Sequence, residues 1–191
     1  MTRLSNPCGL SRRAMLAGMG GLAALAAVPA WANRAPLPEL VAGLPGARLQ
    51  GAGKLTFLGL HVYDMRLWVS EGFSAAAFVD RPLALEIEYA RGLSGQRMAD
   101  RSLEEMQRIA PLSPEQRASW LVAMTQAFPD VNRGDRLTGL YHPGEDTRFY
   151  FNGTLRANVP DSEFARAFFA IWLSPKTSQP KLRLALLGSG A

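Results

Sequence analysis

The chain has 191 residues, of which 48% are hydrophobic, with 21 basic and 16 acidic side chains and a net charge of +5 at pH 7. Its basic residues form no run of the kind that binds nucleic acid or an anionic membrane surface, so both classes of partner are excluded. A single cysteine, Cys8, excludes an internal disulfide and a thiolate metal site.

Residues 1–32 have the pattern of a bacterial export signal. Arginines, including the adjacent pair Arg12 and Arg13, precede an uncharged run rich in alanine and glycine over residues 14–32. The run is shorter and less hydrophobic than a spanning helix, so we expect cleavage after Ala32, not a membrane anchor. The arginine pair predicts a twin-arginine signal, with an ordinary Sec signal as the alternative. The sequence therefore predicts a periplasmic protein.

Residues 33–191 would form the mature protein. Removal of the signal takes three of the 21 basic residues and leaves 18 against 16 acidic residues, a net charge of +2. No cysteine remains, so stability must come from a hydrophobic core. This length is that of one ordinary domain, and we expect a single domain over residues 33–191.

The first part of this domain predicts strands. A lead punctuated by proline and glycine precedes a short strand at residues 47–50 and a glycine turn at 51–53. Residues 55–69 then form a long β-branched and aromatic stretch that is apolar on both faces. A strand of that kind is covered on both sides, so we expect it at the centre of a sheet.

Another strand and two helices follow. Residues 83–89 alternate apolar residues with glutamates, which predicts a strand whose glutamate side faces water. Ser94 precedes one helix, which carries Met98, Leu103, Met106 and Ile109. The next helix opens at the capping box Ser113-Pro114-Glu115-Gln116, and Pro129 ends it.

The last part of the chain predicts three more strands and a helix. Strands are expected near residues 137–141, 147–151 and 155–159, and Asn152-Gly153 joins the last two as a hairpin. Residues 161–172 form a final long helix that is apolar around more than half of its circumference, which indicates burial on several sides. The order of elements predicts an α+β fold with a mostly antiparallel sheet.

A set of short motifs, in this order and spacing, resembles the bacterial exported branch of the chalcone isomerase-like family. The motifs are Gly51-Ala52-Gly53, Val62-Tyr63-Asp64, Leu67-Trp68, Tyr89-Ala90-Arg91, Phe128-Pro129-Asp130-Val131 with Gly134-Asp135, Phe149-Tyr150-Phe151-Asn152-Gly153, Phe168-Phe169-Ala170-Ile171-Trp172-Leu173, and Leu182-Arg183 with Leu186-Leu187-Gly188. The resemblance implies an open-faced β-sandwich, in which a large curved sheet and a layer of helices enclose a cleft.

The plant enzymes of this superfamily close the ring of a chalcone. They hold the phenolate with an arginine, and a threonine and a tyrosine order water at the ketone. Matching the motifs places Leu58 at the threonine, Met98 at the tyrosine and Glu105 at the family's asparagine. Only Arg48 and Ser162 keep related chemistry, and an exposed strand charge and a helix cap are their alternatives. We therefore predict no chalcone isomerase activity and assign no catalytic residue.

The sequence offers little other chemistry. His61 and His142 are the only histidines, and no cluster of His, Asp and Glu at metal-ligand spacing stands out. Gly144-Glu145-Asp146 is interpreted as a turn. We predict no metal ion and no cofactor.

The implied cleft would be lined by aromatic and long side chains together with arginines. The candidate ligand-binding residues are Arg48, Tyr63, Tyr89, Arg91, Met98, Trp120, Phe168 and Trp172. Ordinary core packing is the alternative for each hydrophobic member. Arg91 follows Tyr89 on the same side of its strand. Its guanidinium could extend to solvent at the sheet edge, pair with a buried carboxylate such as Asp135 or contact an acidic ligand, and we expect the ion pair first and the ligand second.

Three functional hypotheses follow. The first is a non-catalytic binder of a small apolar or acidic molecule, such as a fatty acid, because non-enzymatic members of the superfamily bind such ligands. The second is an isomerase or lyase that acts on a phenolic or enone substrate, with Arg48 or Arg91 holding the oxyanion. The third is a periplasmic accessory protein that binds a protein partner through its open sheet face.

Overall fold

The computed structural model describes residues 37–188, so the predicted export signal and its cleavage point lie outside the described residues. The elements are α1 (Pro38–Gly43), β1 (Arg48–Phe57), β2 (Leu60–Val69), the 3-10 helix η2 (Ala75–Asp80), β3 (Leu83–Tyr89), α2 (Gly95–Ile109), α3 (Pro114–Ala127), β4 (Arg136–Tyr141), β5 (Thr147–Phe151), β6 (Thr154–Val159), α4 (Ser162–Leu173) and α5 (Pro180–Leu186). Within residues 37–188, no helix is both long and apolar enough to cross a bilayer.

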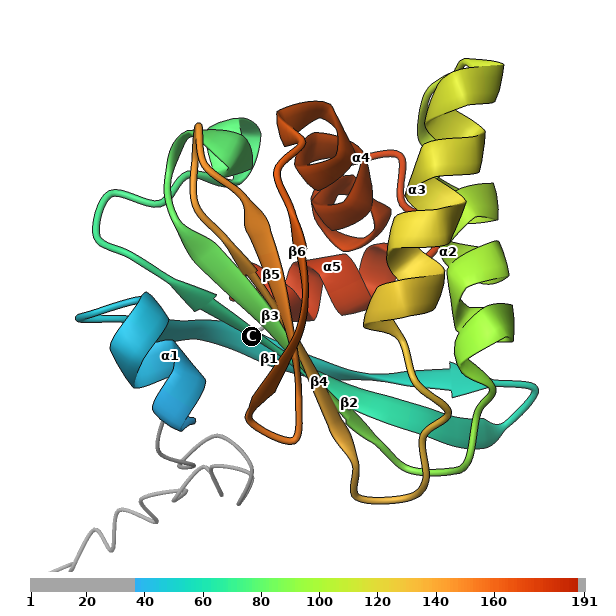
Figure 1. The fold of residues 1–191 in the computed structure, drawn as a ribbon. Helices are drawn as coiled ribbons and strands as arrows, with labels where there is room; N and C mark the ends of the chain where they lie inside the picture. Colours follow the sequence, from blue (N-terminus) through green and yellow to red (C-terminus); the bar gives the residue numbers. More distant parts are fainter. Residues whose placement is uncertain (1–36, 189–191) are drawn as a thin grey trace, which may run out of the picture.

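The strands form one antiparallel sheet in the order β1-β2-β3-β4-β5-β6, so each pairs with its neighbours in the sequence (Figure 1). Helices α2 to α5 lie on one side of the sheet, called here the helix face. Most of the buried apolar residues pack there, among them Met65, Leu67 and Leu85. This arrangement confirms the predicted α+β fold, an open sheet with a helical layer.

The opposite side of the sheet, called here the α1 face, is covered in part by α1. Leu40 and Leu44 pack there with Trp68, Ala84 and Leu140, which alternate along their strands with residues of the helix face. From its proline and glycine residues this segment was expected to be irregular. Six residues are too few to show a helical period, although Pro38 at its start is typical of a first helical position.

The predicted long strand over residues 55–69 is wrong, because the chain reverses at Leu58-Gly59. Leu58 has φ of 49° and Gly59 has φ of 78°, a left-handed pair that makes a tight hairpin between β1 and β2. Leucine is an unusual residue in that conformation, so of the pair only Gly59 is a usual turn residue. As a result β1 is an edge strand, and β2 lies one position further in.

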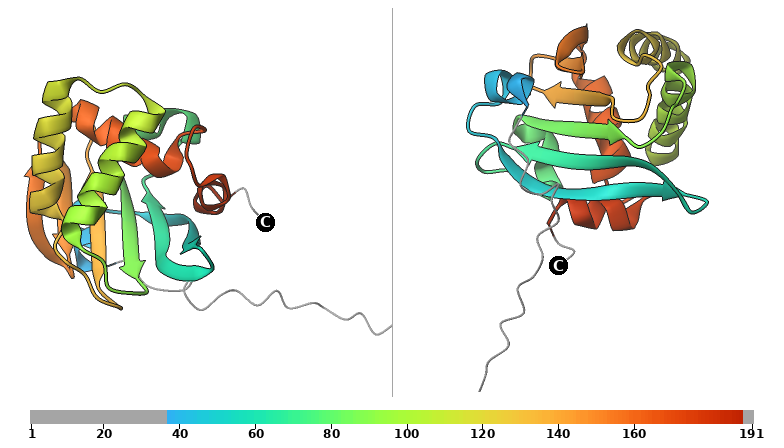
Figure 2. Two further views of the ribbon diagram at one scale, coloured as in Figure 1. Left: turned by 90° about the vertical axis from the view of Figure 1, so that its right-hand side faces the viewer. Right: turned by 90° about the horizontal axis from the view of Figure 1, so that it is seen from below.

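The predicted turn at Gly51-Ala52-Gly53 is also wrong, since these residues lie inside β1. Helix α5, which the sequence analysis did not identify, packs directly on them (Figure 2). A Cβ atom on Gly51 would lie 2.2 Å from the carbonyl oxygen of Ala185, and one on Gly53 would lie 2.7 Å from Leu182. The glycines therefore allow a helix to approach the strand closely.

The glutamate side of β3 was predicted to face water, but it is partly buried. Glu86 is 1% exposed, and Glu88 remains partly exposed. Glu86 accepts hydrogen bonds from Arg66 and from the indole of Trp68, both on the neighbouring strand β2. The alternating pattern placed these carboxylates on the correct side of the sheet but could not reveal the cover and the partners that they have there.

The other predicted elements agree closely with the structure. The strands at residues 83–89 and 147–151 have the predicted bounds, and the capping box at Ser113 forms with both of its hydrogen bonds. Helix α2 begins after Ser94, but its first amide, that of Gly95, donates to Asp130 instead. Helix α4 is capped by Asp161, which accepts from two backbone amides.

Candidate ligand-binding site

A row of aromatic rings runs along α4 on the helix face of the sheet. Phe164, Phe168 and Trp172 are four residues apart and so lie on one side of the helix. The ring centroids of successive members are 5.7 and 5.4 Å apart. Trp120 of α3 continues the row, with its ring 5.8 Å from that of Phe164.

At its other end the row reaches two tyrosines. The indole Nε1 of Trp172 donates to the hydroxyl of Tyr63 at 3.0 Å. Tyr63 of β2 lies opposite Tyr89 of β3 in the sheet, and their rings meet edge to face at 6.2 Å. Five of the eight predicted ligand-binding residues therefore lie in one continuous row, formed by Tyr63, Tyr89, Trp120, Phe168 and Trp172.

The two hydroxyls at this end of the row stay protonated. Burial raises the pKa of Tyr63 to about 12, against the opposing effect of the hydrogen bond from Trp172. Burial raises the pKa of Tyr89 still further, and Tyr63 adds to the shift. Neutral phenols are hydrogen-bond donors. Because the Tyr63 oxygen accepts from Trp172, its own proton is available to an acceptor.

The aromatic side chains fill the space that the sequence analysis expected to be a cleft. Phe168 and Trp172 are 4% and 8% exposed, and Trp120 is 3% exposed and donates to Asp161. Core packing, the alternative considered for these residues, is thus part of their role. In the described part of the chain, these rings line neither of the two pockets described below.

One of those pockets is an open groove between α2 and α3, with a volume of about 370 Å³. It is lined by Leu103, Pro114, Arg117, Ala118 and Leu121. Leu103 belongs to the same core cluster as the aromatic row, and Leu121 packs against that cluster. Arg117 is exposed and makes no side-chain hydrogen bond or ion pair with any residue in 37–188.

The sequence analysis did not identify the residues of this groove. Pro114, Arg117, Ala118 and Leu121 recur at the spacing of one helix face, and this stripe was available in the sequence. It was missed because an apolar stripe on a helix predicts core packing as readily as a ligand groove.

The predicted residues outside the row have separate positions. Met98 is half-buried on α2, and Arg48 is exposed at the start of the edge strand β1. The predicted ion pair of Arg91 with Asp135 is wrong. Arg91 is exposed just after β3, where the chain leaves the sheet, whereas Asp135 accepts hydrogen bonds from Asn152 and from the amide of Asn132.

The positions matched to the threonine and the asparagine of the plant enzymes lie in surroundings unsuited to catalysis. Leu58 is 86% exposed at the tip of the β1–β2 hairpin. Glu105 is buried on α2 and pairs with Arg101 and Arg108 of the same helix. Neither residue can present a hydroxyl to a ketone.

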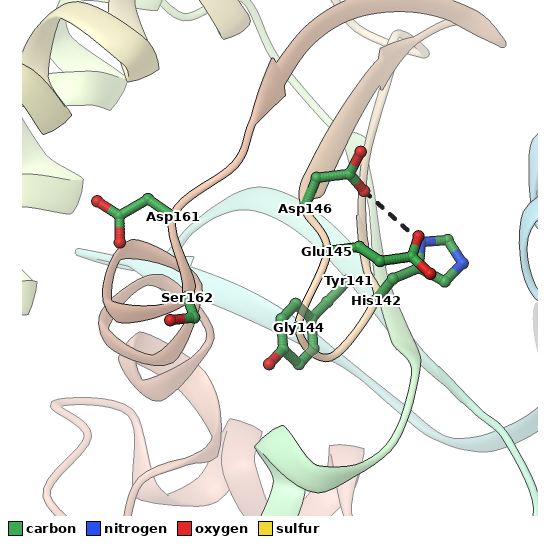
Figure 3. A pocket seen from close by; sticks show the side chains of 7 residues that line it. All are labelled: Tyr141, His142, Gly144, Glu145, Asp146, Asp161 and Ser162. Atoms are coloured by element: carbon green, nitrogen blue, oxygen red, sulfur yellow. Dashed lines mark ion pairs between the residues drawn. The ribbon is translucent and has the colours of Figure 1, made fainter.

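Ser162, the remaining match, begins α4 and lines a small pocket between the start of α4 and the β4–β5 turn. Figure 3 shows this pocket, whose other side chains come mainly from the turn between β4 and β5. That turn brings His142, Glu145 and Asp146 together. The sequence analysis interpreted it only as a turn, because residues three and four apart become neighbours there only once the hairpin closes.

Comparisons with known proteins agree with this architecture. A family model described as chalcone isomerase-like matches residues 45–188. A protein of Haemophilus influenzae is 30% identical over 138 residues, which are 72% of this chain and 66% of that protein, slightly less than two thirds of its length. The crystal structure of a fatty-acid binding protein from Arabidopsis thaliana is similar with a TM-score of 0.57 and 13% identity, over 76% of this chain and 89% of that chain. At that identity the likeness concerns the fold.

Proposed function

Because this chain belongs to the chalcone isomerase-like family, we propose that it is a non-catalytic periplasmic protein that binds a small apolar acid of the fatty-acid type. The fold that it shares with a plant fatty-acid binding protein supports this proposal. The bacterial exported branch of the family, suggested by the sequence motifs, is part of the same proposal.

The groove between α2 and α3 carries the proposal. Its lining is apolar except for Arg117, an exposed guanidinium without a partner among residues 37–188. Ligand sites typically combine apolar walls with a few polar groups that fix orientation, and a guanidinium binds a carboxylate with two parallel hydrogen bonds. We place the acidic end of the ligand at Arg117 and its chain over Leu121 and Leu103.

The aromatic row would form the inner wall of this site. Leu103 joins the groove to the core cluster that contains Phe168 and Trp172. These rings are buried against one another, so a longer ligand that passes Leu103 would reach them only if they moved aside. In this proposal the aromatic row borders the groove through Leu103, whereas Arg48, Arg91 and Met98 do not line it.

Enzyme activity is the alternative function, and the site argues against it. Leu58, Met98 and Glu105 supply none of the groups that order water in the plant enzymes. The hydroxyls of Tyr63 and Tyr89, with their raised pKa values, are poor bases near neutral pH. We expect the purified protein to cyclise a chalcone no faster than the spontaneous reaction, and a rate above this that depends on Arg48 would establish the alternative.

Binding is tested by titrating the mature protein with a long-chain fatty acid and with the alcohol of the same length. Leu121→Trp fills the groove and should abolish binding of both. Val122→Trp is the matched control, because Val122 is exposed on the same helix but does not line the groove. Arg117→Gln should weaken the acid about tenfold and leave the alcohol unchanged, as expected for one lost charge-assisted contact at a surface.

Two results would contradict this ligand assignment. One is wild-type protein that binds neither compound and carries no lipid in native mass spectrometry after isolation from the periplasm. The other is equal binding by the Leu121 and Val122 variants, which would place the ligand elsewhere.

The periplasmic location has a test of its own. The twin-arginine receptor recognises the guanidinium pair, whereas a Sec signal needs only positive charge. Arg12→Lys combined with Arg13→Lys should therefore leave the precursor in the cytoplasm, as measured by cell fractionation. Normal export of this variant would identify a Sec signal, and cytoplasmic wild-type protein would contradict the location itself.

A further inference from the structure

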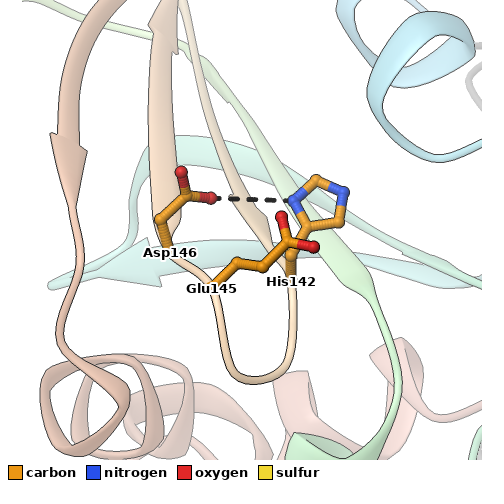
Figure 4. Close-up of side chains that lie close together, drawn as sticks. All are labelled: His142, Glu145 and Asp146. Carbon is orange, nitrogen blue, oxygen red and sulfur yellow. Dashed lines mark ion pairs between the residues drawn. The ribbon is translucent and has the colours of Figure 1, made fainter.

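The turn between β4 and β5 gathers three potential metal ligands. His142 follows β4 directly, and Glu145 and Asp146 precede β5. One ligand atom from each residue lies within 4.8 Å of the others, and Figure 4 shows the three side chains converging above the turn. The group lies apart from the α2–α3 groove and does not depend on the proposed function.

The protonation of His142 follows from its other contact. Its Nε2 lies 2.7 Å from the carbonyl oxygen of Gly43 in α1. A carbonyl oxygen only accepts, so Nε2 carries the proton. In the neutral ring, Nδ1 is then left with its lone pair. This arrangement, in which a histidine donates one ring N–H to a backbone carbonyl, is the usual support of a metal-binding imidazole.

The lone pair of Nδ1 faces a second acceptor. Asp146 Oδ1 lies 3.8 Å away, and both atoms are buried with no hydrogen-bond partner in the described structure. The Asp146 side chain is only 10% exposed, and its other oxygen, Oδ2, accepts from Nε of Arg148 at 3.0 Å. That bond orients the carboxylate so that Oδ1 points at His142. Two buried acceptors that face each other need a hydrogen-bond donor or a cation between them.

A proton on Nδ1, a water that donates to both atoms or a metal ion could fill this position. At 3.8 Å the two atoms are too far apart for a direct hydrogen bond. An ion between them would lie about 2 Å from each, which is the length of zinc bonds to nitrogen and to carboxylate oxygen. A bent arrangement needs the atoms to approach by only a few tenths of an ångström, roughly the tolerance of such sites.

We propose that His142, Asp146 and Glu145 bind a divalent transition-metal ion, with zinc as the representative. The nitrogen ligand favours this class over calcium or magnesium, which take oxygen ligands. Glu145 is 65% exposed and lies 3.8 Å from Arg148, a loose surface contact that it can leave to reach the ion, and the remaining coordination positions are open to water. Arg148 offsets part of the charge of the two carboxylates, and a net negative charge remains for a divalent cation.

Metal binding should also stabilise the fold locally. Through Gly43, His142 links the β4–β5 turn to α1, the helix that covers the α1 face. An ion that fixes the imidazole would hold both segments. Because binding to the folded state raises the melting temperature, the site can be tested without knowledge of its biological role.

The experiment uses untagged mature protein freed of metal, titrated with Zn²⁺ by calorimetry and by thermal melting. Wild type should bind one equivalent and melt at a higher temperature with Zn²⁺. Asp146→Asn should lose binding, and Glu145→Gln should weaken it at least tenfold. Glu145 is exposed, so its variant should fold normally even if Asp146→Asn does not.

His61→Gln is the matched control. His61 makes a similar contact with a carboxylate, Asp64, at 3.2 Å, but both side chains are more than a third exposed and no third ligand joins them. This variant should bind Zn²⁺ like wild type. The proposal is overturned if Zn²⁺ leaves the wild-type melting temperature unchanged, or if the Glu145 and Asp146 variants bind it as tightly as wild type.

Discussion

Arg66 Nη1 lies 2.8 Å from Glu86 Oε1, and the two side chains are 3% and 1% exposed. This ion pair lies on the α1 face of the sheet, between neighbouring strands β2 and β3. The indole of Trp68 donates to the other oxygen of Glu86 at 2.9 Å. The charges are thus buried only because each has hydrogen-bonding partners, a condition that substitution can test.

Removal of one partner from this pair should be costly. Arg66→Met leaves Glu86 as a buried charge and should lower the free energy of unfolding by about 3 to 5 kcal/mol in urea denaturation. Glu86→Gln keeps an acceptor for Trp68. The double variant should therefore lose less stability than the sum of the two single losses. Additive losses, or a loss below about 1 kcal/mol for Arg66→Met, would show that the pair contributes little.

Gly51→Ala tests the contact between α5 and β1. The new methyl group would meet the carbonyl oxygens of Ala185 and Leu186 at 2.2 and 2.5 Å, so the helix must move away. We expect a loss of about 1 to 3 kcal/mol in thermal or urea unfolding. Gly92→Ala is the control, because its nearest neighbour is 3.4 Å away. Equal effects of the two substitutions would contradict the close-approach explanation.

Leu58→Asn should stabilise the protein. Leu58 has a positive φ and is 86% exposed, so it gains little from packing and its backbone is strained. Asn152 adopts the same φ of 49° in the β5–β6 hairpin, where the turn residues are Asn-Gly. We expect a gain of about 0.5 to 1 kcal/mol in the free energy of unfolding. A lower melting temperature would mean that the exposed leucine has contacts of its own.

Alkaline pH should destabilise the protein through the tyrosine pair. The pKa of Tyr63 is about 12 in the folded protein, against 10 as the ordinary value. Between these pH values the unfolded chain releases the proton and the folded chain keeps it. The contribution of each such tyrosine to the free energy of unfolding should therefore be fully present below pH 10. It should fall as the pH rises toward 12, by about 1.4 kcal/mol per pH unit at most.

Denaturation series across this pH range, combined with tyrosinate absorbance, provide the measurement. Tyr63→Phe should reduce the slope of stability against pH. The slope is the relevant quantity, because the variant also removes the acceptor of Trp172 and so shifts stability at every pH. A slope unchanged by the substitution would mean that Tyr63 titrates normally.

The sequence predicted the elements that carry a local signal. Alternation alone defined the strand at 83–89, and Asn152-Gly153 and the capping box at Ser113 located a turn and a helix start. The Leu58-Gly59 reversal has only a weak local signal, because its glycine is a usual turn residue and its leucine is not. The function of Gly51 depends on a helix more than 130 residues later in the chain, and no local pattern contains such a contact.

The candidate site, like the fold, could be predicted only in part from the sequence. Tyr63, Phe168 and Trp172 were chosen as long aromatic residues near one another in the expected fold, and the structure brings them into one row. Side-chain packing determines that these rings fill the expected cleft. It also determines that an open groove lies between α2 and α3. The grouping at His142 depends on closure of the β4–β5 hairpin. These properties are tertiary and lie beyond residue periodicity.

The contact of α5 with β1 has a consequence for biosynthesis. Every strand pairs with its neighbour in the sequence, so the sheet can assemble in order as the ribosome delivers it. Its first strand nevertheless keeps its glycine surface uncovered until Ala185 and Leu186 have been translated. During that interval the face of β1 at Gly51 and Gly53 lacks its helix cover. A chaperone that shields β1, or rapid completion of translation, would thus protect the molecule at its most vulnerable stage.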